Sequence, residues 1–261
     1  MKLHFYKYQG TGNDFIILDN RKGQYANLPK NTIARLCDRR FGIGADGLML
    51  LNNAKGYDFG MTYYNANGLE GSMCGNGGRC LVKFAAEMGI HSETYVFTAI
   101  DGEHLAEITE HGTVRLKMKD VEGVQEEDGD LVLDTGSPHY VKFVSDVQDV
   151  DVHKKGMEIR YSSTFAKQGI NVNFVEQQGH DAIFVRTYER GVEDETLSCG
   201  TGVTAAALVS FHNEIGFNNV VVHTRGGRLE VEFERNPDHS FSQIWLSGPA
   251  EKVFEGTVTT E

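Results

Sequence analysis

Two cysteines in this chain each stand before a glycine-rich turn that leads into an apolar helical run. Cys74 opens the motif Cys-Gly-Asn-Gly, and Cys199 opens the motif Cys-Gly-Thr-Gly. A thiol at the start of a helix ionises more easily, because the unpaired amide N–H groups and the helix dipole favour the thiolate. The same amides form a binding site for a carboxylate. Each motif therefore predicts a reactive sulfur beside an anion-binding turn.

A pair of such sites suits the inversion of a carbon next to a carboxylate. A base removes the hydrogen from one face while an acid delivers a proton to the other, and a thiolate and a thiol can exchange these roles. Helix amides would stabilise the charge that develops on the carboxylate. Under oxidation, Cys74 and Cys199 could instead form a disulfide that silences the site. The sequence has no C-x2-C or H-x3-H pair, so no metal site is expected.

The other two cysteines are expected in the core, because free cysteine is among the most buried residue types. Cys37 lies on the apolar face of a helix expected at 31–40, with Asn31 as its N-cap. Cys80 lies within the helical run that follows the first motif. His139 could likewise be an ordinary core or turn histidine.

Another pattern, Gly42-Ile-Gly-Ala-Asp-Gly47, matches G-x-G-x-x-G. Here a helix precedes the pattern and an apolar strand follows it, which is the reverse of a dinucleotide-binding loop. We interpret it as a turn. The pair Glu189 and Arg190 has an equally plain alternative, a solvated surface pair.

The chain repeats itself. The two cysteine motifs lie 125 residues apart, and matching landmarks precede both at near-constant distances. Together with the cysteine motifs themselves this makes four matches in the same order, which argue for a duplicated domain. The upstream matches are Gly12-Asn-Asp-Phe-Ile16 with Gly136-Ser-Pro-His-Tyr140, Gly44-Ala-Asp46 with Gly169-Ile-Asn171, and Tyr64-Asn65 with Tyr188-Glu189.

Most of the remaining chain is expected to form strands, from its β-branched and aromatic content and its alternation. The run 203–211 is apolar nearly all round, so it predicts a helix that is buried on every side. The expected strands are 15–18, 48–51, 57–63, 95–99, 105–108 and 114–118 in the first half, and 132–133, 140–144, 159–161, 172–175, 182–188, 220–223, 229–233 and 243–246 in the second.

These elements predict an α+β fold of two pseudo-symmetric, duplicated domains. Each domain is expected to be a curved, mostly antiparallel, barrel-like sheet around a central helix. The domains are expected at 1–120 and 121–248, with the acidic stretch 121–130 as linker and the tail 249–261 packed back onto the first domain.

Composition narrows the classes of partner. The chain has 261 residues, 40% of them hydrophobic, and 25 basic against 37 acidic residues give a net charge of −12. Nucleic acid and anionic membranes are therefore not expected as partners. The N-terminus lacks the apolar stretch of a signal peptide, and no run reaches membrane-spanning length, so a cytoplasmic protein is expected.

Over nearly the whole chain these motifs resemble the diaminopimelate epimerase family. The most specific match runs from Tyr188-Glu-Arg-Gly191 to Glu195-Thr-Leu-Ser-Cys-Gly-Thr-Gly202, and Phe41-Gly-Ile-Gly-Ala-Asp46 adds to it. The resemblance implies a cofactor-independent isomerase that interconverts LL- and meso-diaminopimelate in bacterial lysine and cell-wall synthesis. It also implies an active site between two domains that close on the substrate, and a homodimer.

The resemblance also implies a role for individual residues. Cys74 and Cys199 would be the paired acid and base, with His139 as a supporting neighbour. Gly47 and Ser137 stand where the family usually has Gln and Asn, two positions that contact the substrate. The amides of Gly75, Asn76, Gly200 and Thr201 would bind the carboxylate at the reacting carbon, while Asn13, Asn65, Asn171, Glu189 and Arg190 would bind the rest of the substrate.

Two other readings of the sequence stay open. A proline or hydroxyproline racemase would share the two-cysteine logic, although Glu189 and Arg190 suit a substrate with a second amino-acid end. A non-catalytic, two-lobed amino-acid-binding protein would share the duplication. Binding alone does not require a thiol at both helix starts, which favours the enzyme.

Overall fold

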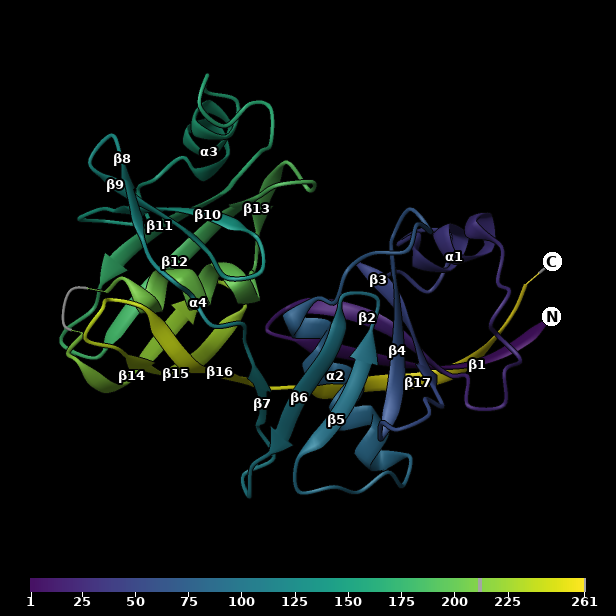
Figure 1. The fold of residues 1–261 in the computed structure, drawn as a ribbon. Helices are drawn as coiled ribbons and strands as arrows, with labels where there is room; N and C mark the ends of the chain where they lie inside the picture. Colours follow the sequence, from purple (N-terminus) through teal and green to yellow (C-terminus); the bar gives the residue numbers. More distant parts are fainter. Residues whose placement is uncertain (211–212, 261) are drawn as a thin grey trace. The chain divides into compact units, whose positions relative to one another are not determined.

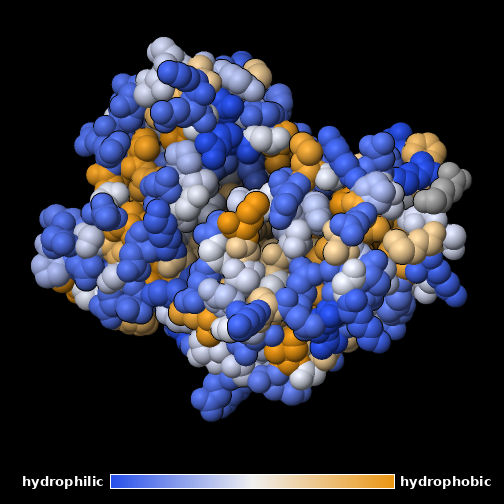
Figure 2. Space-filling model, turned by 45° about the vertical axis from the view of Figure 1, so that its right-hand side comes forward, coloured by the Kyte–Doolittle hydropathy of each residue, from blue (hydrophilic) through white to orange (hydrophobic). Residues whose placement is uncertain are grey.

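The structure is a computed structural model that describes residues 1–210 and 213–260. The chain divides into two compact units, Met1–Leu116 with Gly248–Glu261 and Lys117–Ser247. We call these the first and the second unit. Hydrophilic residues cover most of the face drawn in Figure 2, with apolar residues interspersed among them.

The first unit is one row of strands that carries two helices (Figure 1). The two ends of the chain meet in this row, where the N–H of Thr260 donates to the carbonyl oxygen of Met1 at 2.8 Å. The strands in spatial order are β17 (Glu251–Thr259), β1 (Lys2–Gly10), β2 (Asn13–Asp19), β3 (Gly47–Asn52), β4 (Phe59–Asn65), β5 (Tyr95–Ala99), β6 (Gly102–Ile108) and β7 (Val114–Lys117), with helices α1 (Lys30–Cys37) and α2 (Gly75–Glu87).

The second unit repeats this plan. Its additional short strand, β13 (Asp194–Thr196), pairs with β12. The strands in spatial order are β8 (Gln125–Glu127), β9 (Asp130–Asp134), β10 (Pro138–Phe143), β11 (Asn171–Gln177), β12 (Ala182–Glu189), β14 (Gly216–Thr224), β15 (Gly227–Arg235) and β16 (Phe241–Gly248), with helices α3 (Val152–Arg160) and α4 (Gly200–Leu208).

The directions of neighbouring strands establish the duplication. Along each row the seven pairings read antiparallel, antiparallel, parallel, antiparallel, parallel, antiparallel, antiparallel. Helix α1 connects β2 to β3 and α3 connects β10 to β11, so each joins the first parallel pair of its row. Helices α2 and α4 each lie in the chain before the last strand of the second parallel pair, which is β4 with β5 in the first unit and β12 with β14 in the second. Mostly antiparallel sheets with few helices agree with the expected α+β class.

The register fixes which residues are equivalent. Leu48 pairs with Tyr64, and Val172, which lies 124 positions after Leu48, pairs with Tyr188, which lies 124 positions after Tyr64. Phe15 pairs with Gly47 in the same way that His139 pairs with Asn171. The expected match of Asp46 with Asn171 is therefore wrong by one residue, because the segment between Gly44 and β3 is one residue longer than its counterpart.

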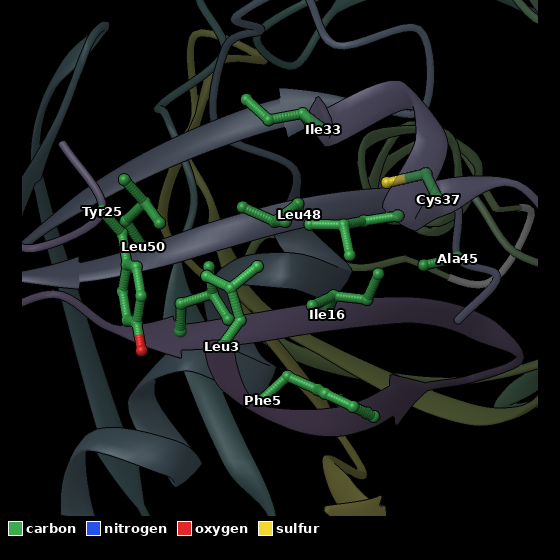
Figure 3. Close-up of a cluster of buried hydrophobic side chains, with 11 residues drawn as sticks. Leu3, Phe5, Ile16, Tyr25, Ile33, Cys37, Ala45, Leu48 and Leu50 are labelled. Atoms are coloured by element: carbon green, nitrogen blue, oxygen red, sulfur yellow. The ribbon is translucent and has the colours of Figure 1, made fainter. Parts of the chain in front are cut away.

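Along β2 and β3, successive side chains point to opposite faces of the first sheet. Ile16, Leu18, Leu48 and Leu50 lie in a buried cluster with α1, which contributes Ile33, Leu36 and Cys37. Figure 3 shows Ile33 and Cys37 beside Leu48 on this face. The opposite face meets α2, which contacts β1, β2, β3, β6 and β17. Because these strands come from distant places in the row, the sheet curves around α2.

The corresponding helix of the second unit is almost entirely buried. From Val203 to Leu208 every residue of α4 is buried, and the helix contacts β10, β11, β12, β14 and β15. This confirms the buried helix that the apolar run predicts, although α4 ends at Leu208 and Phe211 lies outside the described residues. Among the described residues, no pairing joins the first and last strands of either row, so each sheet is curved but not a closed barrel.

Several local predictions are wrong. The expected strand at 159–161 is the end of α3, whose N-cap Asp151 accepts the N–H of Lys154 at 3.1 Å. Helix α1 begins after Pro29, and Asn31 does not cap it. It ends at Cys37, and the Asp38 carboxylate that follows accepts the N–H groups of Arg40 and Phe41, at 2.8 and 2.7 Å. The expected linker contains β8.

Candidate active site

Cys74 is the N-cap residue of α2. Its backbone is extended, with φ −95° and ψ 127°, and its carbonyl oxygen accepts the N–H of Gly78 at 2.7 Å. The Cys74 side chain does not cap the helix. The amides of Gly75 and Asn76 therefore begin the helix among the N–H groups that have no partner within it. A thiol and two donor amides lie together at one helix start.

Asn13 holds an acceptor next to this thiol. Its Nδ2 donates to Oδ2 of Asp46 at 2.5 Å, and Arg39 also binds the Asp46 carboxylate, at 2.6 Å. Because a carboxylate can only accept, the Asn13 amide is held with Oδ1 on the other side. This Oδ1 lies 3.5 Å from Sγ of Cys74 and 3.5 Å from Nδ2 of Asn76.

Behind the helix start lies Arg79, which is fully buried. Its Nη2 donates to Oδ1 of Asn76 at 3.0 Å and to Oγ1 of Thr11 at 3.2 Å, and its Nη1 lies 3.5 Å from the carbonyl oxygen of Gly75. Burial lowers the pKa of this guanidinium. Arg79 thus fixes the first turn of α2, a role that sequence analysis missed.

Cys199 is the N-cap residue of α4. Its backbone is also extended, with φ −116° and ψ 113°, and its carbonyl oxygen accepts the N–H of Val203 at 2.8 Å. The Cys199 side chain is buried and does not cap the helix. Its Sγ lies 3.5 Å from Oγ1 of Thr201. The Thr204 hydroxyl donates to the carbonyl oxygen of Gly200 at 3.0 Å, at the position equivalent to Arg79.

A polar network surrounds Thr201. Oγ of Ser137 lies 3.3 Å from Oγ1 of Thr201 and 3.0 Å from Nε2 of His139. Nδ1 of His139 lies 3.1 Å from Nδ2 of Asn173, and Nδ2 of Asn171 donates to Ser137 at 3.2 Å. Sequence analysis missed Asn173, although an amide between the apolar residues Val172 and Phe174 of an expected strand was the signal that could have found it.

The residues expected to bind the distal end of the substrate lie at strand ends. Asn65 ends β4 and is exposed, with Nδ2 3.5 Å from the carbonyl oxygen of Leu69. Glu189 ends β12 at the equivalent position. The N–H of Arg190 donates to Oδ1 of Asn171 at 2.9 Å, so the structure brings these two predicted residues together within the second unit.

Cys37 and Cys80 are core residues, as expected. Both are buried, and burial raises the pKa of the Cys37 thiol to about 11 and that of the Cys80 thiol to about 12. These two thiols are therefore protonated at neutral pH.

Comparison with known proteins decides the family. The family model "Diaminopimelate epimerase" matches residues 5–124 and 131–253. A diaminopimelate epimerase from Flavobacterium psychrophilum is 51% identical, over 99% of this chain and 100% of the relative. A diaminopimelate epimerase from Chlorobaculum tepidum is 44% identical, over 96% of this chain and 99% of the relative. This chain belongs to the diaminopimelate epimerase family.

Solved structures of other enzymes share the fold of this diaminopimelate epimerase family member. A PhzF-family phenazine biosynthesis protein from Bacillus anthracis covers 100% of both chains with a TM-score of 0.78 at 14% identity. A hydroxyproline epimerase from Agrobacterium vitis has a TM-score of 0.69 at 13% identity, over 98% of this chain and 92% of the other. At such identities the likeness concerns the fold alone.

The resemblance implies glutamine at position 47 and asparagine at position 137, and the structure shows the surroundings of the residues that stand there. A Cβ atom on Gly47 would lie 2.4 Å from Cε2 and 2.8 Å from Oη of Tyr63. The Tyr63 ring thus occupies the space that a glutamine side chain at position 47 would enter. At position 137, the Ser137 hydroxyl lies within hydrogen-bond distance of Thr201 and His139.

The described part of the chain holds no group of three or more His, Cys, Asp or Glu residues placed to bind a metal ion. Among the same residues, no helix has both the length and the apolar character needed to cross a membrane.

Proposed function

We propose that this protein is an epimerase that interconverts LL-2,6-diaminopimelate and meso-2,6-diaminopimelate without a cofactor. The observation that carries the proposal is the repeated one: in a member of this family, the N-cap of the central helix is a cysteine in both units. One thiolate removes the α-hydrogen and the other thiol returns a proton to the opposite face. The two sulfurs exchange roles with each turnover, so the reaction needs no other acid or base.

The carboxylate at the reacting carbon would bind the amides of Gly75, Asn76, Gly200 and Thr201. As the α-hydrogen leaves, negative charge moves onto this carboxylate. Backbone donors at two helix starts oppose that charge without having to reorganise, which lowers the barrier to the carbanion. Both half-sites must act on one substrate for this to work.

The distal amino-acid end needs groups for an ammonium and a carboxylate. We assign the ammonium to Glu189 and the carboxylate to Arg190, and Asn65 and Asn171 also bind this distal end, whereas Asn13 helps to bind the substrate beside Cys74. A guanidinium binds a carboxylate through paired donors, which makes this end selective for a second amino-acid group.

We further propose a cytoplasmic homodimer with diaminopimelate as its small-molecule partner. The family resemblance supports the dimer, and sedimentation equilibrium at micromolar concentration would test it. A single species at the monomer mass would contradict the dimer without affecting the epimerase proposal.

The test of the activity is solvent exchange. We expect the purified protein in D2O to incorporate deuterium at the α-carbon of LL-diaminopimelate, and to form the meso isomer, with a reducing agent and no added pyridoxal phosphate or metal. L-Proline and trans-4-hydroxy-L-proline serve as comparison substrates. Exchange confined to either of them would establish the racemase alternative, and tight binding of diaminopimelate without exchange would establish the binding protein.

Single cysteine variants test the two-base mechanism. We expect Cys74→Ala and Cys199→Ala each to lower epimerisation by more than about 1,000-fold, because general acid and base steps typically contribute 10²–10⁴-fold each. Cys37→Ala is the matched control, since it removes a buried thiol of the same unit as Cys74. Near-normal turnover in either active-site variant would refute the mechanism.

A further inference from the structure

The turn 189–193, which carries Glu189 and Arg190, contains a strained residue. Glu193 has φ +59°, a left-handed conformation that residues other than glycine seldom adopt. This conformation is unfavourable for a residue with a Cβ atom, and it persists only where the surrounding structure holds it. Strain beside two candidate substrate-binding side chains suggests that Glu193 serves to hold them in place.

The equivalent turn of the first unit has glycine at its left-handed position. Gly68 has φ +80°, and its N–H donates to the carbonyl oxygen of Asn65 at 2.8 Å. In the second unit the residue that donates to the carbonyl oxygen of Glu189, also at 2.8 Å, is Glu193. The same backbone hydrogen bond is therefore made without strain in one unit and with strain in the other. The difference is the carboxylate side chain that Glu193 brings.

The Glu193 carboxylate ties the turn to the body of the second unit. Its Oε1 accepts the N–H of Gly191 at 3.0 Å and lies 3.5 Å from Nε of Arg160 at the end of α3. Its Oε2 accepts the hydroxyl of Tyr188 at 3.2 Å, and the hydroxyl of Tyr161 donates to the same carboxylate. One side chain thus links the middle of the turn to a helix and to a strand.

The groups that hold this carboxylate are themselves fixed by packing. Helix α3 contacts both β12 and β13 (Figure 1). Tyr188 on β12 is buried, and a Cβ added to Gly156 of α3 would lie only 2.3 Å from Cβ of Tyr188. The guanidinium carbon of Arg160 lies 4.6 Å from the centre of the Tyr161 ring. Glu193 is therefore anchored to a rigid part of the unit and not to a second mobile loop.

The same carboxylate separates the roles of two arginines. A Cβ added to Gly169 would lie 2.6 Å from Cδ of Arg190 and 2.7 Å from Cζ of Arg160, so the two cationic side chains meet over this glycine. Like charges at such short range repel each other, and Glu193 neutralises Arg160. Nη1 of Arg190 donates to the carbonyl oxygen of Gln168 at 3.0 Å, which orients the guanidinium without neutralising it. Arg190 thus keeps its charge for a carboxylate of the substrate.

We propose that Glu193 is a positioning residue that holds the turn 189–193, so that Glu189 and Arg190 select a substrate with a second amino-acid end. Glu193 acts through these two residues and does not contact the substrate. The selection rests on the proposed function, because that function assigns the distal end of the substrate to Glu189 and Arg190. The anchoring of the turn does not rest on it.

Backbone amide hydrogen exchange tests the anchoring without any substrate. Glu193→Gly removes the carboxylate, while glycine accepts φ +59° without strain, so the variant tests the side chain and not the backbone. We expect the amides of 189–193 to exchange about tenfold faster in this variant, because the turn loses hydrogen bonds to a charged group and opens more often. Asp194→Asn is the matched control. It removes the neighbouring carboxylate, which accepts the N–H of Glu195 at 2.7 Å, and should leave these rates unchanged.

A comparison of two substrates tests the selection. L-Lysine is diaminopimelate without the distal carboxylate, so it lacks the group that we assign to Arg190. From α-deuterium incorporation in D2O, we expect Glu193→Gly to lower the preference for LL-diaminopimelate over L-lysine by about tenfold, through a higher KM for diaminopimelate. Glu193→Gln keeps the length of the side chain and one acceptor oxygen but loses the ion pair with Arg160, so its loss should be intermediate. General damage to the enzyme would instead slow both substrates alike.

The possible failures are distinguishable. Amide exchange that is unchanged in Glu193→Gly would overturn the proposal, whether or not the enzyme is active. Faster amide exchange with an unchanged substrate preference would leave Glu193 a purely structural role and would overturn the selection. If the unchanged protein incorporated no deuterium into diaminopimelate, the proposed function itself would fail, and amide exchange would still decide the anchoring.

Discussion

Two glycines at equivalent places in the two units offer a matched pair of perturbations. Gly202 and Gly77 each occupy the third position after the N-cap cysteine of their helix, and neither has a positive φ that would strain a larger residue. A Cβ on Gly202 would lie 2.3 Å from Oδ1 of Asn173 and 3.3 Å from Cε1 of His139. A Cβ on Gly77 would meet Sδ of Met49 at 3.1 Å, the far end of a flexible side chain.

The expected change in the free energy of unfolding depends on whether the neighbouring side chain can shift. Asn173 is held by three hydrogen bonds, to Tyr140, Thr187 and His139, so it must give up about 1 Å and at least one of these bonds. Overpacking costs about 1–3 kcal/mol and a lost hydrogen bond about 1 kcal/mol more. We expect Gly202→Ala to lower the free energy of unfolding by about 2–4 kcal/mol. For Gly77→Ala, the gain in helix propensity of up to about 1 kcal/mol should offset the shift of Met49.

Thermal unfolding and steady-state kinetics measure both effects. Gly202→Ala should lower the Tm by several degrees and reduce kcat in the fraction that stays folded, because the displaced amide no longer orients His139. Gly77→Ala should keep a Tm close to that of the unchanged protein. If Gly202→Ala were as stable as Gly77→Ala, the close approach of α4 to Asn173 would not be a constraint, and the reasoning would fail.

Two other predictions concern the first unit. Gly47→Gln should lower the free energy of unfolding by about 1–3 kcal/mol, because the new side chain clashes with Tyr63. Tyr63→Ala should recover part of that loss, so chemical unfolding should show the double variant to be more stable than the sum of the two single losses predicts. Strictly additive losses would contradict the clash. Although burial alone would raise it, hydrogen bonds from Arg39 and Lys7 hold the pKa of Asp14 at about 2. Because this pKa is depressed in the folded state, Asp14 stabilises the protein above pH 4 and loses that contribution as pH falls from about 4 to about 2. Urea midpoints should therefore drop more steeply over this range for the unchanged protein than for Asp14→Asn, and parallel profiles would exclude the effect.

Most of the correct predictions from the sequence came from the distribution of apolar residues and from repeated motifs. The buried helix α4 could be predicted because its residues are apolar on every side, and the duplication because cysteine and glycine landmarks recur at fixed distances. The tail 249–261 was expected on the first domain, but the pairing of β17 with β1 could not be predicted, because it joins residues as distant in sequence as Leu3 and Val258. Such pairing leaves no local signal in the sequence.

The site was partly predictable for a related reason. The motifs indicate which residues could carry the chemistry, so both cysteines and Asn13 could be named as candidates. Of the supporting residues, Asn173 lies between Val172 and Phe174 and Arg79 lies between Gly78 and Cys80, and the partners of both are unknown until the elements are placed. The roles assigned to the substrate-binding residues stay predictions until the assays are done.

The two units have the same strand order, but the side chains beside the two sulfurs differ: Asn13 lies next to Cys74 and Thr201 next to Cys199. Such divergence suits an enzyme in which one proton is shared between two thiols, because identical surroundings would leave the protonation state undefined. The bias must also be small, since each cysteine has to serve as base in one direction. A single hydrogen bond contributes about 1 kcal/mol, which shifts a ratio of two states five- to tenfold. Under the proposed two-base mechanism, a bias of this size would favour one resting state and still leave either thiol able to act as the base.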